Sequence, residues 1–146
     1  MTTYYAVVES HIRYGILLWG GTSEANLNKI QVLQKKAVRA LSDLGPTDSC
    51  REAFKALGLL TVTALYIHAV VTYTDQLNLP RNINFHSYNT RRAADYSLPL
   101  HHTTKFSNKP SYIGRKIINS LPQDLKNLTG ENLKRHLKNW LVERLC

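Results

Sequence analysis

The chain has 146 residues, which suits one domain with a real hydrophobic core. Lys and Arg outnumber Asp and Glu by 19 to 10, and the formal net charge of +9 favours an anionic partner such as nucleic acid. The two cysteines lie far apart and no secretory signal is apparent, so we expect a nuclear or cytoplasmic protein without a disulfide framework. The most apolar stretch, residues 59–73, is shorter than the roughly 20 residues of a membrane span, so no membrane partner is expected.

Apolar residues at the three-and-four spacing of a helix predict a first helix over residues 4–19, which Gly20 and Gly21 end. The predicted buried face of this helix contains Tyr5, Val8, Ile12, Ile16 and Trp19. Aromatic residues on or beside apolar stripes, Tyr14 among them, are expected in the core.

A second helix is predicted from Ser23, which can cap it, to about Ser42. Its predicted inner face contains Leu27, Ile30, Leu33, Ala37 and Leu41, and its opposite side carries Lys29, Lys35, Lys36 and Arg39.

Two more helices are predicted before residue 80. After the break at Gly45, a short helix begins at Asp48 or Ser49 and ends at Gly58. The next helix opens at Thr61 and is apolar on nearly every side, which is typical of the central helix of a bundle.

Residues 80–109 lack apolar periodicity and predict a long irregular loop, which is either functional or poorly ordered. Between Asp75 and Asp124 the only acidic residue is Asp95. The basic residues in the same interval are Arg81, Arg91, Arg92, Lys105, Lys109, Arg115 and Lys116. This interval therefore has the most one-sided charge of the chain.

Pro110 begins a helix that ends at Leu121, and a last helix starts at Thr129 or Gly130. Together these patterns predict an all-α fold, an irregular bundle of about six helices with a long basic loop. We expect a helical bundle over residues 1–79, the loop over 80–109, and helices over 110–146 that pack on the same core.

The sequence shows no arrangement of residues that is typical of a catalytic site. Two-metal polymerase chemistry needs neighbouring carboxylates, and no two acidic residues are adjacent here. Asp75 is interpreted as a helix-end carboxylate, and the neighbours His101 and His102 as solvated or phosphate-facing side chains. We therefore predict no catalytic residue, no metal site, no cofactor and no small-molecule substrate.

Several sequence words, taken in order, resemble one family. They are YYAVVESHIRYGI at 4–16 followed by Trp19 and Gly20, LQKKAVR at 33–39, FKALGLLT at 54–61, HSYNTR at 86–91 and PSYIG at 110–114. They resemble the region downstream of the polymerase core in jockey-like non-LTR retrotransposon reverse transcriptases of arthropods, and the resemblance spans nearly the whole chain. It departs at His102 and Ile118, where the family usually has Arg and Tyr.

The resemblance implies a non-catalytic fragment, the thumb-side and C-terminal portion of an RNA-directed DNA polymerase. Its implied role is backbone-level contact with RNA or an RNA/DNA hybrid. The alternatives are a helical docking module for the missing polymerase core, or a decayed relic with no selected activity. The expected nucleic-acid-binding residues are Lys35, Lys36, Arg39, Tyr88, Arg91, Arg92, Arg115 and Lys116, with Tyr88 as a candidate for stacking on an unpaired base.

Overall fold

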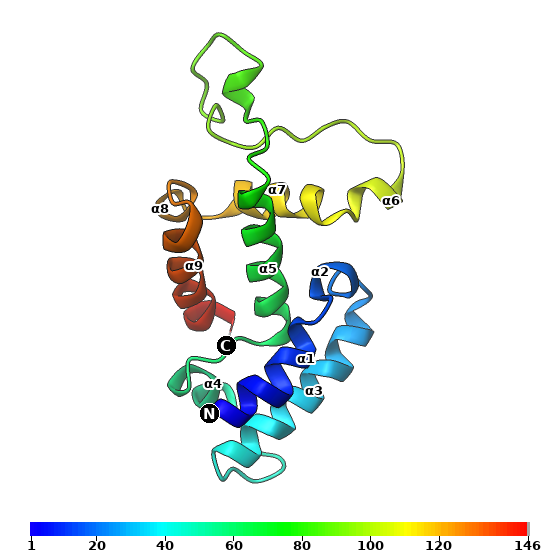
Figure 1. Cartoon of the computed structure of the whole chain (residues 1–146), viewed down its shortest axis with the longest axis vertical. Coiled ribbons are helices and arrows are strands. Elements are labelled where there is room, and N and C mark those ends of the chain that lie inside the picture. The colour runs from blue at the N-terminus through cyan, green and yellow to red at the C-terminus, as the bar shows by residue number, and fades with distance from the viewer. Residues whose placement is uncertain (146) are drawn as a thin grey trace. The chain divides into compact units, whose positions relative to one another are not determined.

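The computed structural model describes residues 1–145, and within that range the chain is helical, with one isolated antiparallel bridge between Arg81 and Tyr96 and no sheet. The all-α prediction is confirmed. Figure 1 shows the elements, which are η1 Tyr4–Glu9 (a π-helix), α1 Ser10–Arg13, α2 Ile16–Trp19, α3 Glu24–Leu41, α4 Arg51–Ala56, α5 Val62–Gln76, η2 Asn82–Asn84 (a 3-10 turn), α6 Thr104–Ser107, α7 Pro110–Ser120, α8 Gln123–Lys126 and α9 Gly130–Leu145. No helix in the described part of the chain is both long enough and apolar enough to cross a bilayer.

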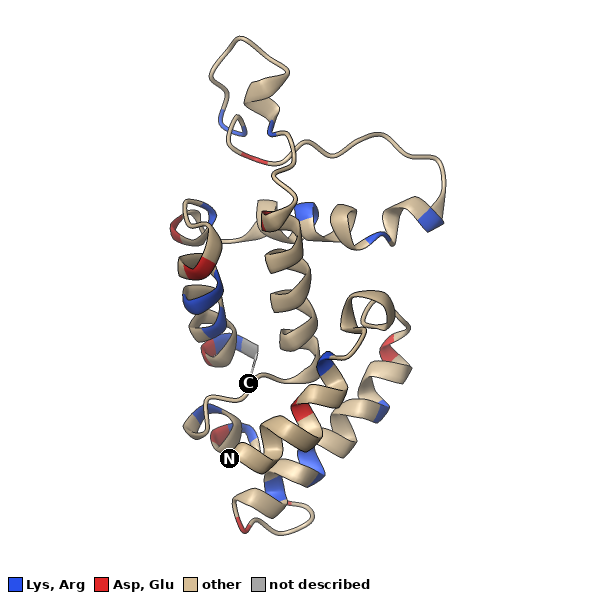
Figure 2. Cartoon of the chain, viewed as in Figure 1, with Lys and Arg blue, Asp and Glu red and all other residues tan. Residues whose placement is uncertain are grey.

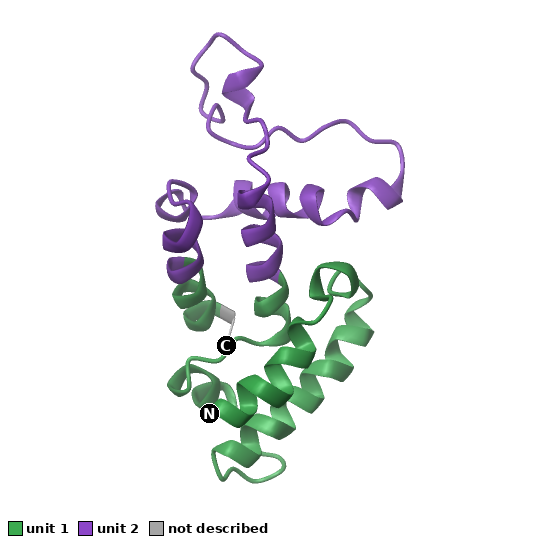
Figure 3. Ribbon diagram, in the orientation of Figure 1, with its two compact units in different colours: residues 1–66, 137–146 green, residues 67–136 purple. Residues whose placement is uncertain are grey.

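The chain divides into two compact units (Figure 3). Unit 1 contains residues 1–66 and those from 137 onward, and unit 2 contains residues 67–136. Helices α5 and α9 therefore each contribute residues to both units. The predicted segments 1–79, 80–109 and 110–146 follow composition along the chain, whereas the units follow spatial contacts.

The predicted first helix is not continuous. It is interrupted at Tyr14 and Gly15, because Gly15 adopts a left-handed backbone with φ of 64° that a glycine accommodates without strain. Tyr14 is consequently 85% exposed, so its predicted place in the core is wrong. Its carbonyl oxygen accepts a 2.7 Å hydrogen bond from the Trp19 indole nitrogen, which holds the turn closed.

The core of unit 1 forms between η1, α3 and α4. Its buried cluster consists of Tyr4, Val38, Cys50, Phe54 and Leu59. The predicted inner face of α3 is wrong by about one residue, because Gln34 and Val38 are buried while Leu33 is 64% exposed. The start of the first helix shows the same shift, since Tyr4 is buried and the predicted Tyr5 is 39% exposed, whereas Ile12 and Ile16 are buried as predicted.

A buried amide explains this shift. The Gln34 Nε2 donates to the Tyr4 hydroxyl at 2.9 Å and to the Leu60 carbonyl at 2.8 Å. Its Oε1 accepts from the Val62 backbone nitrogen at 3.0 Å. A polar side chain is buried at little cost when its hydrogen bonds are made, so Gln34 joins three segments of unit 1 from within the core.

In unit 2, α7 lies directly against α5. A side chain at Gly114 would bring its Cβ to 1.8 Å from the Thr74 Oγ1, so only a glycine fits this crossing. Thr74 is buried, and its hydroxyl donates to the Val70 carbonyl at 2.8 Å. The Asp75 carboxylate accepts from the backbone nitrogen of Gly130 at 2.8 Å and so ties the end of α5 to the start of α9.

Candidate nucleic-acid interface

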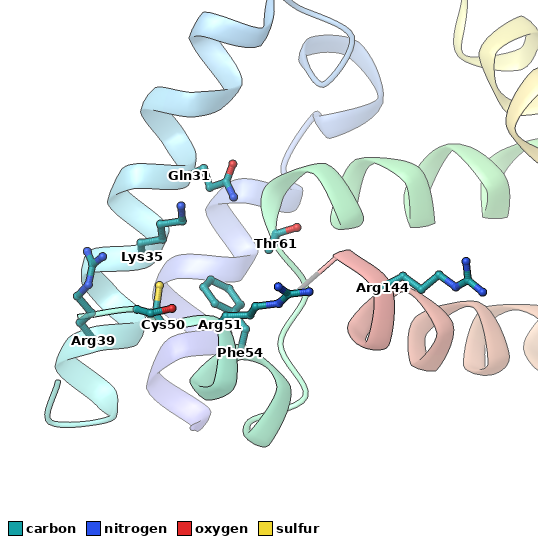
Figure 4. A pocket seen from close by; sticks show the side chains of 9 residues that line it. Gln31, Lys35, Arg39, Cys50, Arg51, Phe54, Thr61 and Arg144 are labelled. Atoms are coloured by element: carbon teal, nitrogen blue, oxygen red, sulfur yellow. The ribbon is translucent and has the colours of Figure 1, made fainter. Parts of the chain in front are cut away.

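Unit 1 contains a basic cavity of about 450 Å³, which we call the α3–α4 pocket. Figure 4 shows the side chains around it. The lining residues are Gln31, Lys35, Arg39, Ser49, Cys50, Arg51, Phe54, Thr61 and Arg144. Four of these residues are basic and none is acidic. Gln31, Lys35 and Arg39 follow at intervals of four residues on α3, which places them on one helix face.

Arg39 is held in position by the chain that leads into α4. Its Nε donates to the Asp48 carbonyl at 2.9 Å. The Asp48 carboxylate accepts from the Gly45 backbone nitrogen at 2.8 Å, so it stabilises the turn and does not line the pocket. The Arg39 guanidinium is thus anchored through one of its five N–H donors.

Unit 2 contains a second basic cavity, of about 680 Å³, which we call the loop–α7 pocket. Its lining residues are Asn82, Arg91, Arg92, Ala94, Asp95, Tyr96, Leu98, Lys116, Asn119, Ser120, Gln123 and Lys126. The basic residues Arg91, Arg92 and Lys116, predicted from sequence, thus line one cavity together with Lys126. Lys and Arg occur in both units (Figure 2).

The first half of the predicted loop is fixed to α7 and α8. The Asn119 amide makes two hydrogen bonds to the Tyr96 backbone, accepting from its nitrogen at 2.8 Å and donating to its carbonyl at 3.0 Å. Lys126 forms a 3.0 Å salt bridge with Asp95. The Arg81 guanidinium lies 4.2 Å from the centre of the Tyr96 ring. The Asn82 amide donates to the Arg92 carbonyl at 2.9 Å, which holds the backbone beside Arg91 and Arg92.

Arg115 differs from the other predicted residues of this region. Its Nη1 donates to the Ser97 carbonyl at 2.9 Å, and it does not line the loop–α7 pocket. Its buried Nε has no hydrogen-bond partner among the described residues. In this geometry Arg115 fastens the loop to α7.

Tyr88 lies on the exposed part of the loop. Its ring is 72% exposed and stacks on His86, with ring centres 6.5 Å apart and an angle of 9° between the planes. Phe85 nearby is 61% exposed. Exposed aromatic rings beside arginines are the groups that stack on the bases of single strands.

Two of the predicted residues on α3 line the α3–α4 pocket, and the third does not. Lys35 and Arg39 line it, whereas Lys36 is exposed outside it. The sequence reading missed Arg51, Lys126 and Arg144, whose side chains line the two pockets. The excess of basic over acidic residues signalled an anionic partner but gave no means of ranking these three, since each comes from a separate segment.

The neighbouring histidines do not behave alike. The His101 ring packs against Tyr112 and Phe106, with ring centres 4.7 and 5.8 Å away, so it is half-buried in an aromatic cluster and not fully solvated. Its alternative role beside a phosphate stays a prediction. His102 is exposed.

A stretch of 70 residues, 48% of this chain, is 34% identical to a "Probable RNA-directed DNA polymerase from transposon BS" of Drosophila melanogaster. This stretch covers 8% of that relative's length. No family model matches the chain, and no solved structure matches it. The similarity supports a region related to a transposon reverse transcriptase.

Proposed function

We propose that this chain is the thumb-side and C-terminal part of a jockey-like non-LTR retrotransposon reverse transcriptase, and that it binds RNA or an RNA/DNA hybrid through the sugar–phosphate backbone. The main support for this proposal is the loop–α7 pocket. Three basic residues predicted to bind nucleic acid, from two separate segments of the chain, line it together: Arg91, Arg92 and Lys116. The similarity to a transposon RNA-directed DNA polymerase favours a nucleic acid as the anionic partner.

The physical basis is counterion release. Each phosphate that a Lys or Arg neutralises frees condensed counterions, which favours binding without reading any base. The proposed contacts are Lys35, Lys36 and Arg39 on α3, with Arg91, Arg92 and Lys116 in unit 2. Arg115 acts by positioning the loop, and Tyr88 with its stacked partner His86 offers a ring to an unpaired base.

Fluorescence anisotropy with single-stranded RNA, an RNA/DNA hybrid and duplex DNA, each titrated across salt, tests this function. The expected result is tighter binding to RNA or hybrid than to duplex DNA, with affinity that falls steeply as salt rises. Weak binding that ignores the kind of nucleic acid contradicts it.

Tyr88 allows a separate test of stacking. Tyr88→Ala is expected to weaken single-stranded RNA binding about tenfold, because stacking on an aromatic ring contributes about 1–3 kcal/mol per base. Phe85→Ala, at another exposed ring of the loop, measures whether that ring stacks on a base as well. Unchanged affinity in Tyr88→Ala would remove this residue from the interface.

A second candidate function is docking onto a polymerase core, and an exposed apolar surface on unit 1 favours it. Two apolar hollows, each between the N-terminal helices and α3, share Val7, Val8 and Ala37. Val7 is 57% exposed and Leu33 is 64% exposed. Exposed apolar patches of this kind mark interaction surfaces. Self-association of the isolated chain that Leu33→Ser abolishes, seen as a change of mass in solution, would support docking, and a monomer at all concentrations would count against it.

A further inference from the structure

The volume of the α3–α4 pocket limits which ligands can enter it. Its volume of about 450 Å³ falls in the range of roughly 300–1,000 Å³ that small-ligand sites occupy. A nucleic-acid duplex is too wide to enter a cavity of this size and would lie across its opening. A strand end or a single nucleotide is small and flexible enough to occupy it.

The charge of the pocket favours an anion with more than one negative charge. Lys35 and Arg39 are one helical turn apart on α3, and like charges at this spacing repel each other. Arg51 and Arg144 also line the cavity, and none of the lining residues that the structure describes is acidic. A terminal phosphate monoester carries about 1.5 to 2 negative charges near pH 7, whereas an internal phosphodiester carries about one. The monoester therefore matches the lining better.

Neutral donors complete the lining. Gln31 and Thr61 line the same cavity as the cations. The Thr61 hydroxyl accepts from the Ala64 backbone nitrogen at 3.3 Å and keeps its own proton to donate. The Arg39 side chain is held by its 2.9 Å hydrogen bond to the Asp48 carbonyl, so its position is set before any ligand arrives. Pre-positioned guanidinium groups suit phosphate because they donate in a planar fork.

The aromatic group of the pocket offers little to a base. The Phe54 ring is 2% exposed and belongs to the core of unit 1, so it has almost no face available for stacking. Recognition in this pocket must then come from charge and hydrogen bonding.

We propose that the α3–α4 pocket binds a terminal phosphate monoester, supplied by the end of a nucleic-acid strand or by a free nucleotide, without base preference. This inference deepens the function proposed above and, for the strand-end ligand, rests on it. Unit 1 would then bind the phosphorylated end of the strand, whereas the loop–α7 pocket would contact phosphates within it.

The test compares short single-stranded RNAs that are identical except for a phosphate or a hydroxyl at the unlabelled end. In fluorescence anisotropy the phosphorylated RNA is expected to bind about tenfold more tightly, because charge-assisted hydrogen bonds to the extra group are gained. The quantity of interest is the ratio of the two affinities, which removes effects common to both RNAs.

Lys35→Gln and Lys36→Gln form a matched pair, since they remove the same charge from neighbouring positions of one helix and only Lys35 lines the pocket. Lys35→Gln is expected to bring the ratio close to one. Lys36→Gln is expected to keep the native ratio even if both affinities fall. Thermal melting checks that each variant folds, and Arg144→Gln, at an exposed lining residue, replaces Lys35→Gln if that variant does not.

Competition by pyrophosphate and by a nucleoside monophosphate identifies the source of the phosphate. Displacement of the phosphorylated RNA supports a pocket that also takes free nucleotides, and a preference for the phosphorylated RNA without displacement supports a strand-end pocket. A ratio of one in the native chain, with no binding of either competitor, overturns the inference. Tight, salt-sensitive binding of both RNAs at a ratio of one leaves the proposed function standing alone, whereas pyrophosphate binding that needs Lys35 without RNA binding refutes the proposed function alone.

Discussion

At the residue scale, Gln34 is the side chain on which the arrangement of unit 1 depends most. It is 1% exposed, and its amide bonds the Tyr4 hydroxyl, the Leu60 carbonyl and the Val62 backbone nitrogen. Two of these partners are backbone groups, one just before α5 at Leu60 and one at its first residue, Val62. Without the amide they would be left in the core with an unmet hydrogen bond.

Gln34→Leu is expected to lower the free energy of unfolding by about 2–4 kcal/mol, because two buried backbone groups lose their partner and each unsatisfied group costs about 1–3 kcal/mol. Urea denaturation measures the change. Gln76→Leu, at an exposed position of α5, is the control and should stay within about 0.5 kcal/mol of the native chain. A loss below about 1 kcal/mol for Gln34→Leu would show that the amide network is not stabilising.

Tyr66 gives a prediction about alkaline pH. Burial raises the pKa of its phenol above the ordinary value of about 10. Above that pH the unfolded chain has released this proton while the folded chain still binds it, so stability falls as pH rises from about 10 toward the folded pKa. Below about pH 10 the contribution is constant. In urea denaturation at about pH 9 and about pH 11, Tyr66→Phe should lose less stability than the native chain between the two conditions. An equal loss in both chains would contradict this.

The sequence predicted buried faces approximately but not to the residue. Its three-and-four spacing identified Ile12 and Ile16 correctly, and both are buried. It chose Leu33 over Gln34, because a periodicity of apolar residues cannot register a glutamine whose hydrogen bonds are all made inside the core. The displaced Leu33 is instead exposed at an apolar hollow of unit 1.

At the scale of the elements, the crossing of α5 and α7 depends on Gly114. A Cβ there would come within 1.8 Å of the Thr74 Oγ1 and 3.1 Å of the Val70 Cγ1. Thr74 is buried with its hydroxyl bonded to Val70, so it has no room to move aside. The two helices approach this closely because the residue at the crossing has no side chain.

Gly114→Ala is expected to destabilise the chain by about 1–3 kcal/mol through overpacking, although alanine favours a helix over glycine by about 1 kcal/mol. Ser120→Ala, at an exposed position of α7, is the control for the substitution to alanine. The comparison uses midpoints and slopes of urea unfolding. A more stable Gly114→Ala chain would mean that the helices do not cross as closely as the structure has them.

Asp75 links two elements through a charged hydrogen bond. Asp75→Ala should cost about 1–2 kcal/mol, because the Gly130 nitrogen at the start of α9 loses its 2.8 Å partner. Asp75→Asn retains an oxygen acceptor and should cost less, and thermal melting of the two variants measures the difference. Equal stability of native and Asp75→Ala chains would rule out this structural role.

The elements were predictable where local signals were strong. Pro110 marked the beginning of α7, and Gly130, with a left-handed φ of 58°, stands at the start of α9 as expected. The order within the predicted loop was not predictable, because the Asn119 amide bonds the backbone of Tyr96 across 23 positions of sequence. The break at Gly15 was missed because the apolar spacing continues through it to Ile16.

At the scale of the whole molecule, each unit contains a pocket whose lining includes four basic residues. Composition predicted an anionic partner, and helix periodicity placed Lys35 and Arg39 on one side of their helix. Neither indicated that Arg51 and Arg144 line the same cavity, since these residues come from α4 and α9. Separate segments form this pocket, so it arises only in the tertiary fold. No local pattern in the sequence indicates it.

The central claim is that the loop–α7 pocket contacts phosphates, and the salt dependence of RNA binding tests it most directly. Arg91→Gln combined with Arg92→Gln removes two charges from the pocket, and Lys29→Gln combined with Lys55→Gln removes two charges from positions outside both basic pockets. The slope of log affinity against log salt for single-stranded RNA should become shallower by about 1.4 in the arginine pair, since each lost phosphate contact reduces it by about 0.7. The lysine pair should keep a slope close to that of the native chain. Equal slopes in both pairs would contradict the account, because the two arginines would then contribute only to the overall charge.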